Sequence, residues 1–309
     1  MKNYKTFEEI AQLWQSDKKQ YVKKSTFASY SLLLANHLLP SFGGGINDIT
    51  EEVVQHFVFK KLNSGLSHKT IKDILIVLKM ILRFGAKNKM MEYRQINIKF
   101  PTERERQNIE VLSKANQRKI MDYITTNFTF RNLGIYICLC AGMRIGEVCA
   151  LTWDDMDVES GVIKINKTIQ RIYVLDNGSN HTEVIIDTPK SKNSIRDVPM
   201  SKNLLKIVKP LKRVVNGRFY VLTNDANPIE PRTYRNYYSH LMRELNIPAL
   251  KFHGLRHSFA TRCIESRCDY KTVSVLLGHS NISTTLNLYV HPNMEQKKRC
   301  VEQMFKSLR

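Results

Sequence analysis

Four side chains between residues 252 and 289 are of the types that bind a phosphodiester and attack it. His253 and Arg256 are three positions apart, so a helix places both on one face. His279 follows a glycine at a predicted helix end, and Tyr289 lies ten residues later. A guanidinium holds phosphoryl oxygens through paired hydrogen bonds, histidines add donors, and a phenol oxygen is a nucleophile. This set predicts chemistry at a phosphorus atom.

A second arginine suited to the same anion lies well upstream. Arg144 opens a predicted helix directly after residues 133–141, whose apolar character favours a buried helix, and Gly142 breaks that helix. On its own, Arg144 could simply pair with Glu147, three residues later. Together with Arg256 it would supply two guanidiniums for the two non-bridging oxygens of one phosphate.

These residues belong to motifs that occur in a fixed order. His-x-x-Arg at 253–256 is followed by Leu-Leu-Gly-His at 276–279 and then by Tyr289, while Ala-Gly-Met-Arg-Ile-Gly-Glu at 141–147 precedes Leu-Thr-Trp. The arrangement resembles the tyrosine recombinases of the phage-integrase family, over most of residues 110–295. The resemblance implies that the scissile phosphate is gripped by Arg144, with Glu147 in support, and that the site is completed by His253, Arg256, His279 and the nucleophile Tyr289.

A basic segment at residues 188–200 resembles the family's β-hairpin, whose lysine enters the cleft as a general acid. The segment reads Thr-Pro-Lys-Ser-Lys-Asn-Ser-Ile-Arg-Asp-Val-Pro-Met, and we interpret it as a hairpin tip that returns to a short strand. Lys190, directly after Thr-Pro, matches that lysine. Lys192 is the second choice.

The resemblance implies a site-specific DNA recombinase that performs integrase- or excisionase-type strand exchange for a mobile genetic element. A tyrosine with a pKa near 10 is ionised only about once in a thousand at pH 7, so cationic neighbours and a histidine that takes its proton would activate it. The lysine would protonate the departing 5′-oxygen, and the product would be a 3′-phosphotyrosine. Because that link retains the bond energy, rejoining needs neither ATP nor a metal, and we expect no cofactor.

The sequence also offers two candidate metal sites. His253 and His257 have the helical spacing of a zinc pair, but the usual intervening glutamate is missing and Arg256 lies between them. We therefore favour a structural role for His257. The acidic triplet at 154–157 could bind Mg²⁺, but no second acidic cluster completes such a site, and a polar turn is favoured.

Two other functions fit part of the pattern. A type IB topoisomerase shares the tyrosine chemistry, but the short chain and the hairpin segment argue against it. A non-catalytic DNA-binding protein on the same scaffold is also conceivable. All six expected active-site positions are occupied by suitable residues, which argues against that alternative.

The charge of the chain points to a polyanionic partner. There are 48 basic and 28 acidic residues, a net charge of +20, which favours nucleic acid first and an anionic membrane second. No apolar run approaches the roughly 20 residues of a membrane span, and no signal peptide precedes the first helix, so we expect a cytoplasmic protein that is nucleoid-associated on DNA. The six cysteines show no C-x-x-C pair and are interpreted as reduced core thiols.

The predicted fold is mainly α with a small antiparallel sheet. Helix starts are expected near Thr6, Ser25, Thr50, Ser67 and Ser113, and the second helix should stop near Pro40. Strand patterns occupy 162–173 and 183–187, and further helices are expected at 202–215 and 231–245. We predict a helical bundle over 1–102, a linker over 103–110, and a domain with a C-terminal tail helix over 111–309. By resemblance, these are a SAM-like core-binding domain and an α+β catalytic domain.

The expected partner is a double-stranded DNA recombination site. The predicted DNA contacts are Lys23, Lys24, Thr26, Lys69, Lys192 and Arg232. The resemblance implies a homotetramer on DNA formed by exchange of the C-terminal tail, and it allows an accessory directionality factor. The apolar residues of that tail could instead fold back onto their own domain.

One position departs from the family pattern. The helix that ends near Ser266 is commonly closed by glycine, and here the position carries Arg267. Arg267 must therefore adopt a left-handed conformation, or the helix must end with a different cap.

Overall fold

The computed structural model describes residues 5–43, 46–102, 109–176, 179–189, 191–290 and 294–308. Lys190 and most of the predicted linker lie outside the described residues. The chain divides into two compact units, one formed by Met1–Arg106 with Ile172–Glu183 and the other by Gln107–Arg171 with Val184–Arg309. Among the described residues, no helix combines the length and hydropathy needed to cross a membrane.

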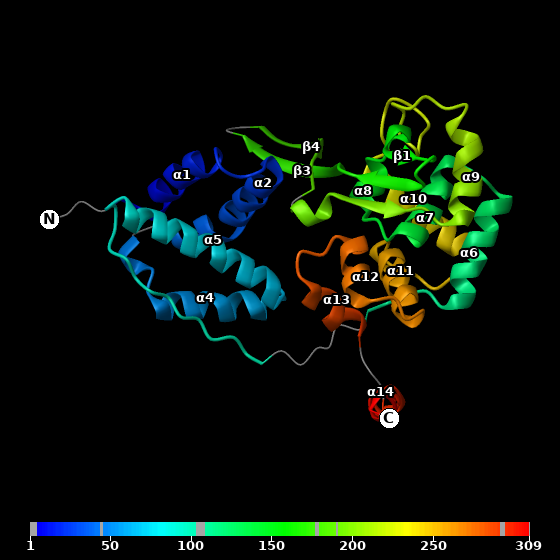
Figure 1. Ribbon diagram of the computed structural model, residues 1–309. Coiled ribbons are helices and arrows are strands. Elements are labelled where there is room, and N and C mark those ends of the chain that lie inside the picture. The colour runs from blue at the N-terminus through cyan, green and yellow to red at the C-terminus, as the bar shows by residue number, and fades with distance from the viewer. Residues whose placement is uncertain are drawn as a thin grey trace. The chain divides into compact units, whose positions relative to one another are not determined.

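The N-terminal part of the first unit is helical, as predicted, whereas residues 172–176 and 179–183 of this unit belong to two strands. Its helices are α1 Phe7–Lys18, α2 Lys24–Leu33, the π-helix η1 Leu34–Leu38, α3 Leu39–Phe42, the 3-10 helix η2 Ile46–Asp48, α4 Glu51–Asn63 and α5 His68–Lys87 (Figure 1). The predicted caps are confirmed, since the side chains of Thr6, Thr50 and Ser67 accept hydrogen bonds from backbone N–H groups in the first turns of α1, α4 and α5. The apolar stripe of α5 then packs against α1 and α4.

The second helix does not stop at Pro40, as the sequence predicted, but continues to Phe42. A proline inside an α-helix clashes with the carbonyl four residues earlier and lacks an N–H donor. Here a wide π turn, η1, immediately precedes the proline turn. The wider turn changes the hydrogen-bond pattern before Pro40, so the chain can pass the proline without leaving the helical path.

The second unit combines helices with small sheets. Its helices are α6 Lys114–Thr126, α7 Phe130–Ala141, α8 Ile145–Cys149, η3 Trp153–Asp155, η4 Lys192–Ser194, α9 Lys202–Lys212, α10 Pro231–Glu244, α11 His253–Glu265, α12 Tyr270–Leu277, α13 Ile282–Tyr289 and α14 Met294–Ser307. The apolar α7 is buried and packs against α6, α8, α9 and α11, while α12 and α13 pack on α11 (Figure 1). The predicted helix starts at Ser113 and Arg144 are confirmed.

The strands differ from the prediction in their pairing. The pattern at 162–173 is two strands, β2 Val162–Ile165 and β3 Thr168–Asp176, and they belong to different sheets. β3 pairs with β4 Ser179–Asp187, whereas β5 Arg196–Pro199 pairs with β2 in an antiparallel sheet of order β1-β2-β5, where β1 is Met156–Asp157. The segment at 188–200 is therefore not a hairpin tip between paired strands. It crosses from the β3–β4 pair to the other sheet.

The cysteine prediction holds only in part. Cys138 and Cys149 are buried in the second unit's core, and Cys140 and Cys263 are half-buried. Cys268 and Cys300 are exposed, so the interpretation as core thiols was wrong for these two.

Candidate active site

Arg256 is the anchor of the candidate site. It lies on α11, its side chain is 1% exposed, and Nη1 and Nη2 donate to the carbonyl oxygens of Gly142 (2.8 Å) and Leu277 (2.5 Å). Those carbonyls lie at the C-terminal ends of α7 and α12, where helices leave such groups without intrahelical partners. Burial and then the charge of Arg144 lower the pKa of Arg256 to about 9. The guanidinium therefore remains a cation at pH 7 and joins three helices.

Arg144 approaches the same place from another element. It occupies the N-cap position of α8, and its Nη1 donates to Oε1 of Glu147 at 2.7 Å, while Nη2 donates to the carbonyl oxygen of Gly278 at 3.3 Å. The pairing with Glu147 that could have explained Arg144 on its own is present. The contact with Gly278 also brings this arginine to the residue that precedes His279.

Glu147 connects Arg144 with a third arginine, Arg196, that the sequence analysis did not select. Glu147 is 3% exposed and Arg196 is 7% exposed, and Nη2 of Arg196 lies 2.9 Å from Oε2 of Glu147. Nε of Arg196 also donates to the carbonyl oxygen of Leu276 at 2.7 Å. Burial raises the pKa of Glu147, but hydrogen bonds and charge from Arg196, together with the charge of Arg144, outweigh burial and leave the pKa below its ordinary value. The carboxylate is thus ionised between two guanidiniums.

His279 is positioned by the turn that ends α12. Gly278 has a φ of 66°, a left-handed conformation that glycine adopts without steric cost. The Nδ1 atom of His279 lies 2.8 Å from Oγ1 of the buried Thr285, which fixes the ring. Burial, followed by the charges of Arg256 and Arg144, lowers the pKa of His279 to about 4. The imidazole is therefore neutral at pH 7, next to both arginines.

Tyr289 ends α13 and points to α11. Its Oη lies 2.6 Å from Nδ1 of His257, and its side chain packs against the buried cluster of Ala260, Val273 and Leu277. Burial raises the pKa of Tyr289 to about 12, although the positive charge of Arg256 acts in the opposite direction. The phenol is thus protonated at pH 7, and a histidine that the sequence analysis judged structural is its hydrogen-bond partner.

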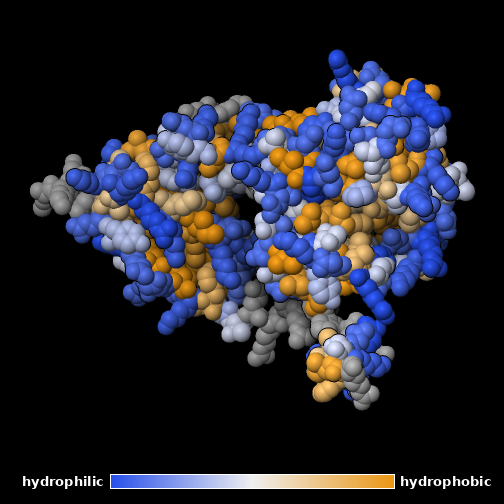
Figure 2. Space-filling view, in the orientation of Figure 1, coloured by the Kyte–Doolittle hydropathy of each residue, from blue (hydrophilic) through white to orange (hydrophobic). Residues whose placement is uncertain are grey.

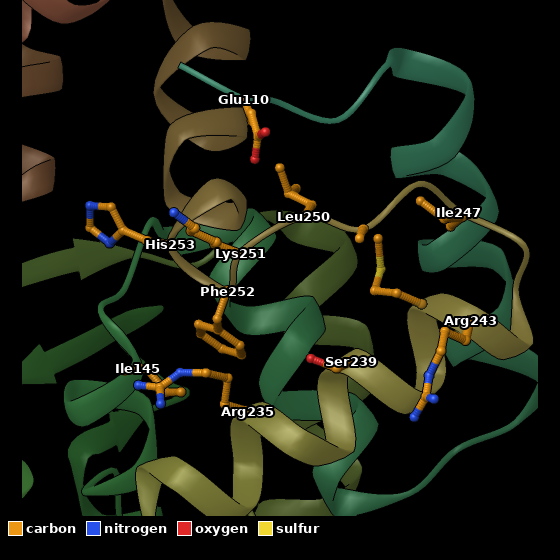
Figure 3. A pocket seen from close by; sticks show the side chains of 12 residues that line it. Glu110, Ile145, Arg235, Ser239, Arg243, Ile247, Leu250, Lys251, Phe252 and His253 are labelled. Carbon is orange, nitrogen blue, oxygen red and sulfur yellow. The ribbon is translucent and has the colours of Figure 1, made fainter. Parts of the chain in front are cut away.

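His253 begins α11 and contacts His257, with ring centroids 4.5 Å apart in an edge-to-face arrangement. Part of its ring is exposed, but burial of the rest, the adjacent His257 and the charge of Arg256 hold its pKa below the ordinary value. His253 also lies at the rim of a cavity of about 790 Å³ whose wall includes Arg235 and Lys251 (Figure 3). The site therefore opens onto a surface that carries further cations.

Of the two candidate lysines, the structure describes only Lys192. Lys190 lies outside the described residues. Lys192 is exposed and begins η4, and this short helix is close to the end of α12, because a Cβ on Gly278 would lie 2.8 Å from the carbonyl oxygen of Asn193. The segment that carries the lysines thus reaches the turn that positions His279.

The predicted DNA contacts lie on both units. Lys23 is the N-cap residue of α2, Lys24 and Thr26 lie in its first turn, and Lys69 lies in the first turn of α5. Lys24 forms an ion pair with Glu183, at 2.5 Å, within the first unit. Arg232 is exposed in the first turn of α10, in the second unit. Lys192, the sixth predicted contact, begins η4 in the second unit.

The acidic residues at 154–157 are only partly in a turn, since Asp154 and Asp155 lie in the short 3-10 helix η3 and Asp157 lies in β1. Asp155 accepts hydrogen bonds from the backbone and hydroxyl of Thr152 and lies 2.8 Å from Nζ of Lys167. In the part of the chain that the structure describes, no group of three His, Cys, Asp or Glu side chains is arranged to hold a metal ion.

Arg267 stands where the family commonly has the glycine that closes α11. It has a φ of 61°, and the N–H groups of Arg267 and Cys268 donate to the carbonyl oxygens of Ile264 and Cys263. Of the two outcomes considered for this position, the left-handed conformation is the one present. A non-glycine residue thus closes α11 with the bonding usually found at a glycine.

Comparisons with known proteins agree with this geometry. Residues 110–296 match the phage integrase family, and residues 6–62 match the phage integrase N-terminal SAM-like domain. A tyrosine recombinase XerC-like protein of Caldanaerobacter subterraneus subsp. tengcongensis is 30% identical over 307 residues, covering 91% of this chain and 77% of that protein. The chain therefore belongs to the phage integrase family and is a tyrosine-type site-specific DNA recombinase.

Two solved structures share the fold. An integrase of transposon Tn1549 in complex with transposon right end DNA superposes with a TM-score of 0.76 at 22% identity, covering 97% of this chain and 99% of that one. A lambda integrase tetramer bound to a Holliday junction gives a TM-score of 0.63 at 16% identity, covering 94% and 80%. The predicted fold class, a helical SAM-like domain with a mixed α and β domain, is confirmed.

Proposed function

We propose that this recombinase cleaves and rejoins double-stranded DNA through a 3′-phosphotyrosine formed on Tyr289. The observation that carries the proposal is the convergence of Arg144, Arg256 and His279 at the adjoining ends of α7, α8 and α12. Two cations and a neutral imidazole from distant parts of the sequence meet there, and the charge of Arg256 reaches Tyr289. These groups can stabilise the five-coordinate phosphorus of the transition state, whose phosphoryl oxygens carry increased negative charge.

Each residue has a distinct part in the proposed reaction. Arg144 and Arg256 hold the non-bridging oxygens, and His253 and His279 donate hydrogen bonds to the phosphoryl group. Oη of Tyr289 forms a bond to phosphorus while the bond to the 5′-oxygen breaks. Lys190, with Lys192 as second choice, gives that oxygen its proton. In the reverse step the 5′-hydroxyl attacks the phosphotyrosine, so no nucleotide cofactor is consumed.

The proposed biological setting is a mobile genetic element. The integrase whose fold this chain shares is described in complex with the end of its own transposon. We propose integrase- or excisionase-type exchange, carried out in the cytoplasm on the nucleoid, with an accessory factor setting direction. The test compares strand exchange by the purified protein with exchange in the presence of cell extract. If both directions proceed equally in both cases, a role for such a factor is contradicted.

The test of the nucleophile uses a suicide DNA substrate, nicked so that the short 5′-hydroxyl strand diffuses away after cleavage. Wild-type protein should form a covalent adduct on DNA that carries the junctions flanking its gene, and Tyr289→Phe should form none. Tyr270→Phe is the matched control, because Tyr270 is an exposed tyrosine on α12. An adduct that persists in Tyr289→Phe removes Tyr289 from its role, and wild type that binds but never cleaves refutes catalysis.

The proposed assembly is a homotetramer on two duplexes, with residues 1–102 as the core-binding domain, 111–309 as the catalytic domain and the tail exchanged between protomers. Val301, Met304 and Phe305 of α14 and Leu308 directly after it are between 48% and 74% exposed, so this apolar surface is available to another protomer (Figure 2). Met304→Ser combined with Phe305→Ser should leave binding to a single site intact and abolish the two-site complex in a gel-shift assay. Lys298→Ser, an exposed change on the same helix, is the control.

A further inference from the structure

The phenol of Tyr289 has a hydrogen-bond partner that no assigned role explains. Its Oη lies 2.6 Å from Nδ1 of His257, and the two rings are tilted, with centroids 5.6 Å apart. A general base must lie about 2.6–3.2 Å from the atom whose proton it takes. His257 meets that requirement, whereas the ring of His253 packs edge-to-face against the ring of His257.

We propose that His257 is a catalytic residue that accepts the phenol proton as Tyr289 attacks the scissile phosphate. This inference rests on the proposed function and assigns to it the missing proton acceptor. As Oη bonds to phosphorus, the Oη–H bond breaks and the proton moves to Nδ1 of His257. The bond from phosphorus to the 5′-oxygen breaks, and that oxygen is protonated by the lysine. On religation the proton on His257 returns to Oη, so both residues regain their starting states.

The surroundings of His257 suit a neutral acceptor. Among the described residues, the charged and titratable groups that act on it are His253 and Arg256 on its own helix and Tyr289 on α13. From α12, Val273 and Leu277 contribute apolar side chains to the cluster that packs beside Tyr289. Burial and then the charge of Arg256 hold the pKa of His257 below its ordinary value. The imidazole is therefore neutral at pH 7, and in the tautomer that carries its proton on Nε2 the Nδ1 atom can receive the phenol proton.

The need for a proton acceptor follows from the state of the phenol. Burial raises the pKa of Tyr289 to about 12, so spontaneous ionisation at pH 7 is rarer than for an exposed tyrosine. The cation of Arg256 favours the phenolate but does not outweigh burial. Transfer of the proton to an adjacent base during attack avoids forming a free phenolate beforehand.

The experiment measures single-turnover adduct formation on DNA with a 5′-bridging phosphorothiolate at the scissile position. A thiolate leaves without being protonated, so the rate no longer depends on the lysine. His257→Asn keeps an acceptor near the position of Nδ1 but has no basicity. We expect it to slow adduct formation about 10²–10⁴-fold, the usual contribution of a general base, with DNA affinity unchanged. His240→Asn, an exposed histidine on α10, should react like wild type.

The pH profile separates proton transfer from a structural role. The wild-type rate should fall as pH drops below 6.5, because His257 becomes protonated. In His257→Asn that fall should disappear, and the rate should increase toward high pH as Tyr289 ionises. A His257→Asn variant with the wild-type rate and profile overturns the inference. Should that variant fail to bind DNA, a wild-type rate that is constant between pH 7.5 and 5 overturns it instead.

Failure of the proposed function would look different. If wild type forms no adduct, or if Tyr289→Phe still forms one, the phosphotyrosine proposal itself is wrong. If the adduct forms on Tyr289 while His257→Asn is unaffected, only the assignment of His257 is wrong.

Discussion

The guanidinium of Arg256 makes structural hydrogen bonds and, in the proposed reaction, also binds the phosphate. Arginine has five N–H donors, and the two bonds to Gly142 and Leu277 use one hydrogen from each terminal nitrogen. Three donors remain for phosphoryl oxygens. The carbonyl bonds hold the fork in one orientation before the anion arrives, which reduces the entropy lost on binding.

The depressed pKa of His279 predicts a loss of stability in mild acid. Its pKa is about 4 in the folded protein and about 6.5 when unfolded, so between these values the unfolded chain binds more protons. The free energy of unfolding should therefore decrease as pH falls from 6.5 toward 4. Urea midpoints at pH 7, 6 and 5 measure this decrease.

His279→Gln should make the urea midpoint less dependent on pH over that range. Some dependence should remain, because His253 and His257 also have lowered pKa values. His240→Gln should retain the full wild-type dependence. If the urea midpoint depends equally on pH in wild type and in His279→Gln, then His279 is protonated similarly in the folded and unfolded states.

At the scale of elements, Arg196 joins three pieces of the second unit. It lies on β5, contacts Glu147 of α8 and donates to Leu276 of α12. Removing one partner of a buried ion pair costs about 3–5 kcal/mol, and the low end applies here because Arg144 still contacts Glu147. We predict that Arg196→Leu lowers the free energy of unfolding by about 3 kcal/mol and reduces cleavage.

The matched control for Arg196 is Arg171→Leu. Arg171 pairs with Glu230 near the surface, with side chains 39% and 21% exposed, and because solvent screens such a pair its loss should cost much less than the loss of Arg196. Urea unfolding of both variants provides the comparison. Equal losses would show that the pair between Arg196 and Glu147 adds nothing beyond a surface contact.

The turn at Gly278 couples α12 to the segment that carries the candidate lysines. Besides the left-handed φ, a Cβ here would lie 2.8 Å from the carbonyl oxygen of Asn193, which is backbone and cannot rotate away. Gly278→Ala should therefore cost more than the roughly 1–2 kcal/mol of the conformation alone, and cleavage should fall as His279 shifts. Gly161→Ala has a similar φ but only an ordinary contact, at 3.5 Å from Leu205. Thermal unfolding of the two variants should differ, and equal effects would exclude the contact with Asn193.

Local signals in the sequence were enough to predict most helices. Caps at Thr6, Thr50, Ser67 and Ser113 and the break at Gly142 depend on neighbouring residues only, and the structure has all five. Strand pairing is not local. β5 pairs with β2 more than thirty positions earlier, and nothing in the pattern at 188–200 specified that partner.

Arg196 and His257 were not predicted as site residues for the same reason, which is that their partners lie far away in the sequence. Arg196 shares the inward parity of Val198 in β5, a pattern that indicates a buried cation, but its partner Glu147 lies 49 positions away. His257 was weighed as a zinc ligand or a structural histidine, because its contact with Tyr289 spans 32 positions. For Arg196, the usable signal was that a charged residue alternates in phase with the buried Val198 of the same strand. For His257 no local signal distinguished the roles.

At the scale of the whole molecule, the net charge of +20 predicts strongly salt-dependent DNA binding. A protein that contacts about six to ten phosphates loses about 10³–10⁵-fold in affinity between 50 and 200 mM salt. Lys69→Ala should weaken binding to specific and unrelated DNA alike and reduce the slope of log K against log salt by about one. Lys119→Ala, an exposed change on α6, should not alter the slope. Fluorescence anisotropy titrations at several salt concentrations decide between them.

The bond between His257 and Tyr289 joins two residues of the same polypeptide. Each copy of the chain therefore carries the proposed nucleophile near its own Arg256, and the proposed cleavage needs no tyrosine from a neighbouring copy. Mixing Tyr289→Phe with Arg256→Lys should consequently not restore cleavage, since every copy in the mixture lacks one half of the machinery. Rescue in such a complementation assay would mean that the tyrosine travels to a neighbour before it reacts.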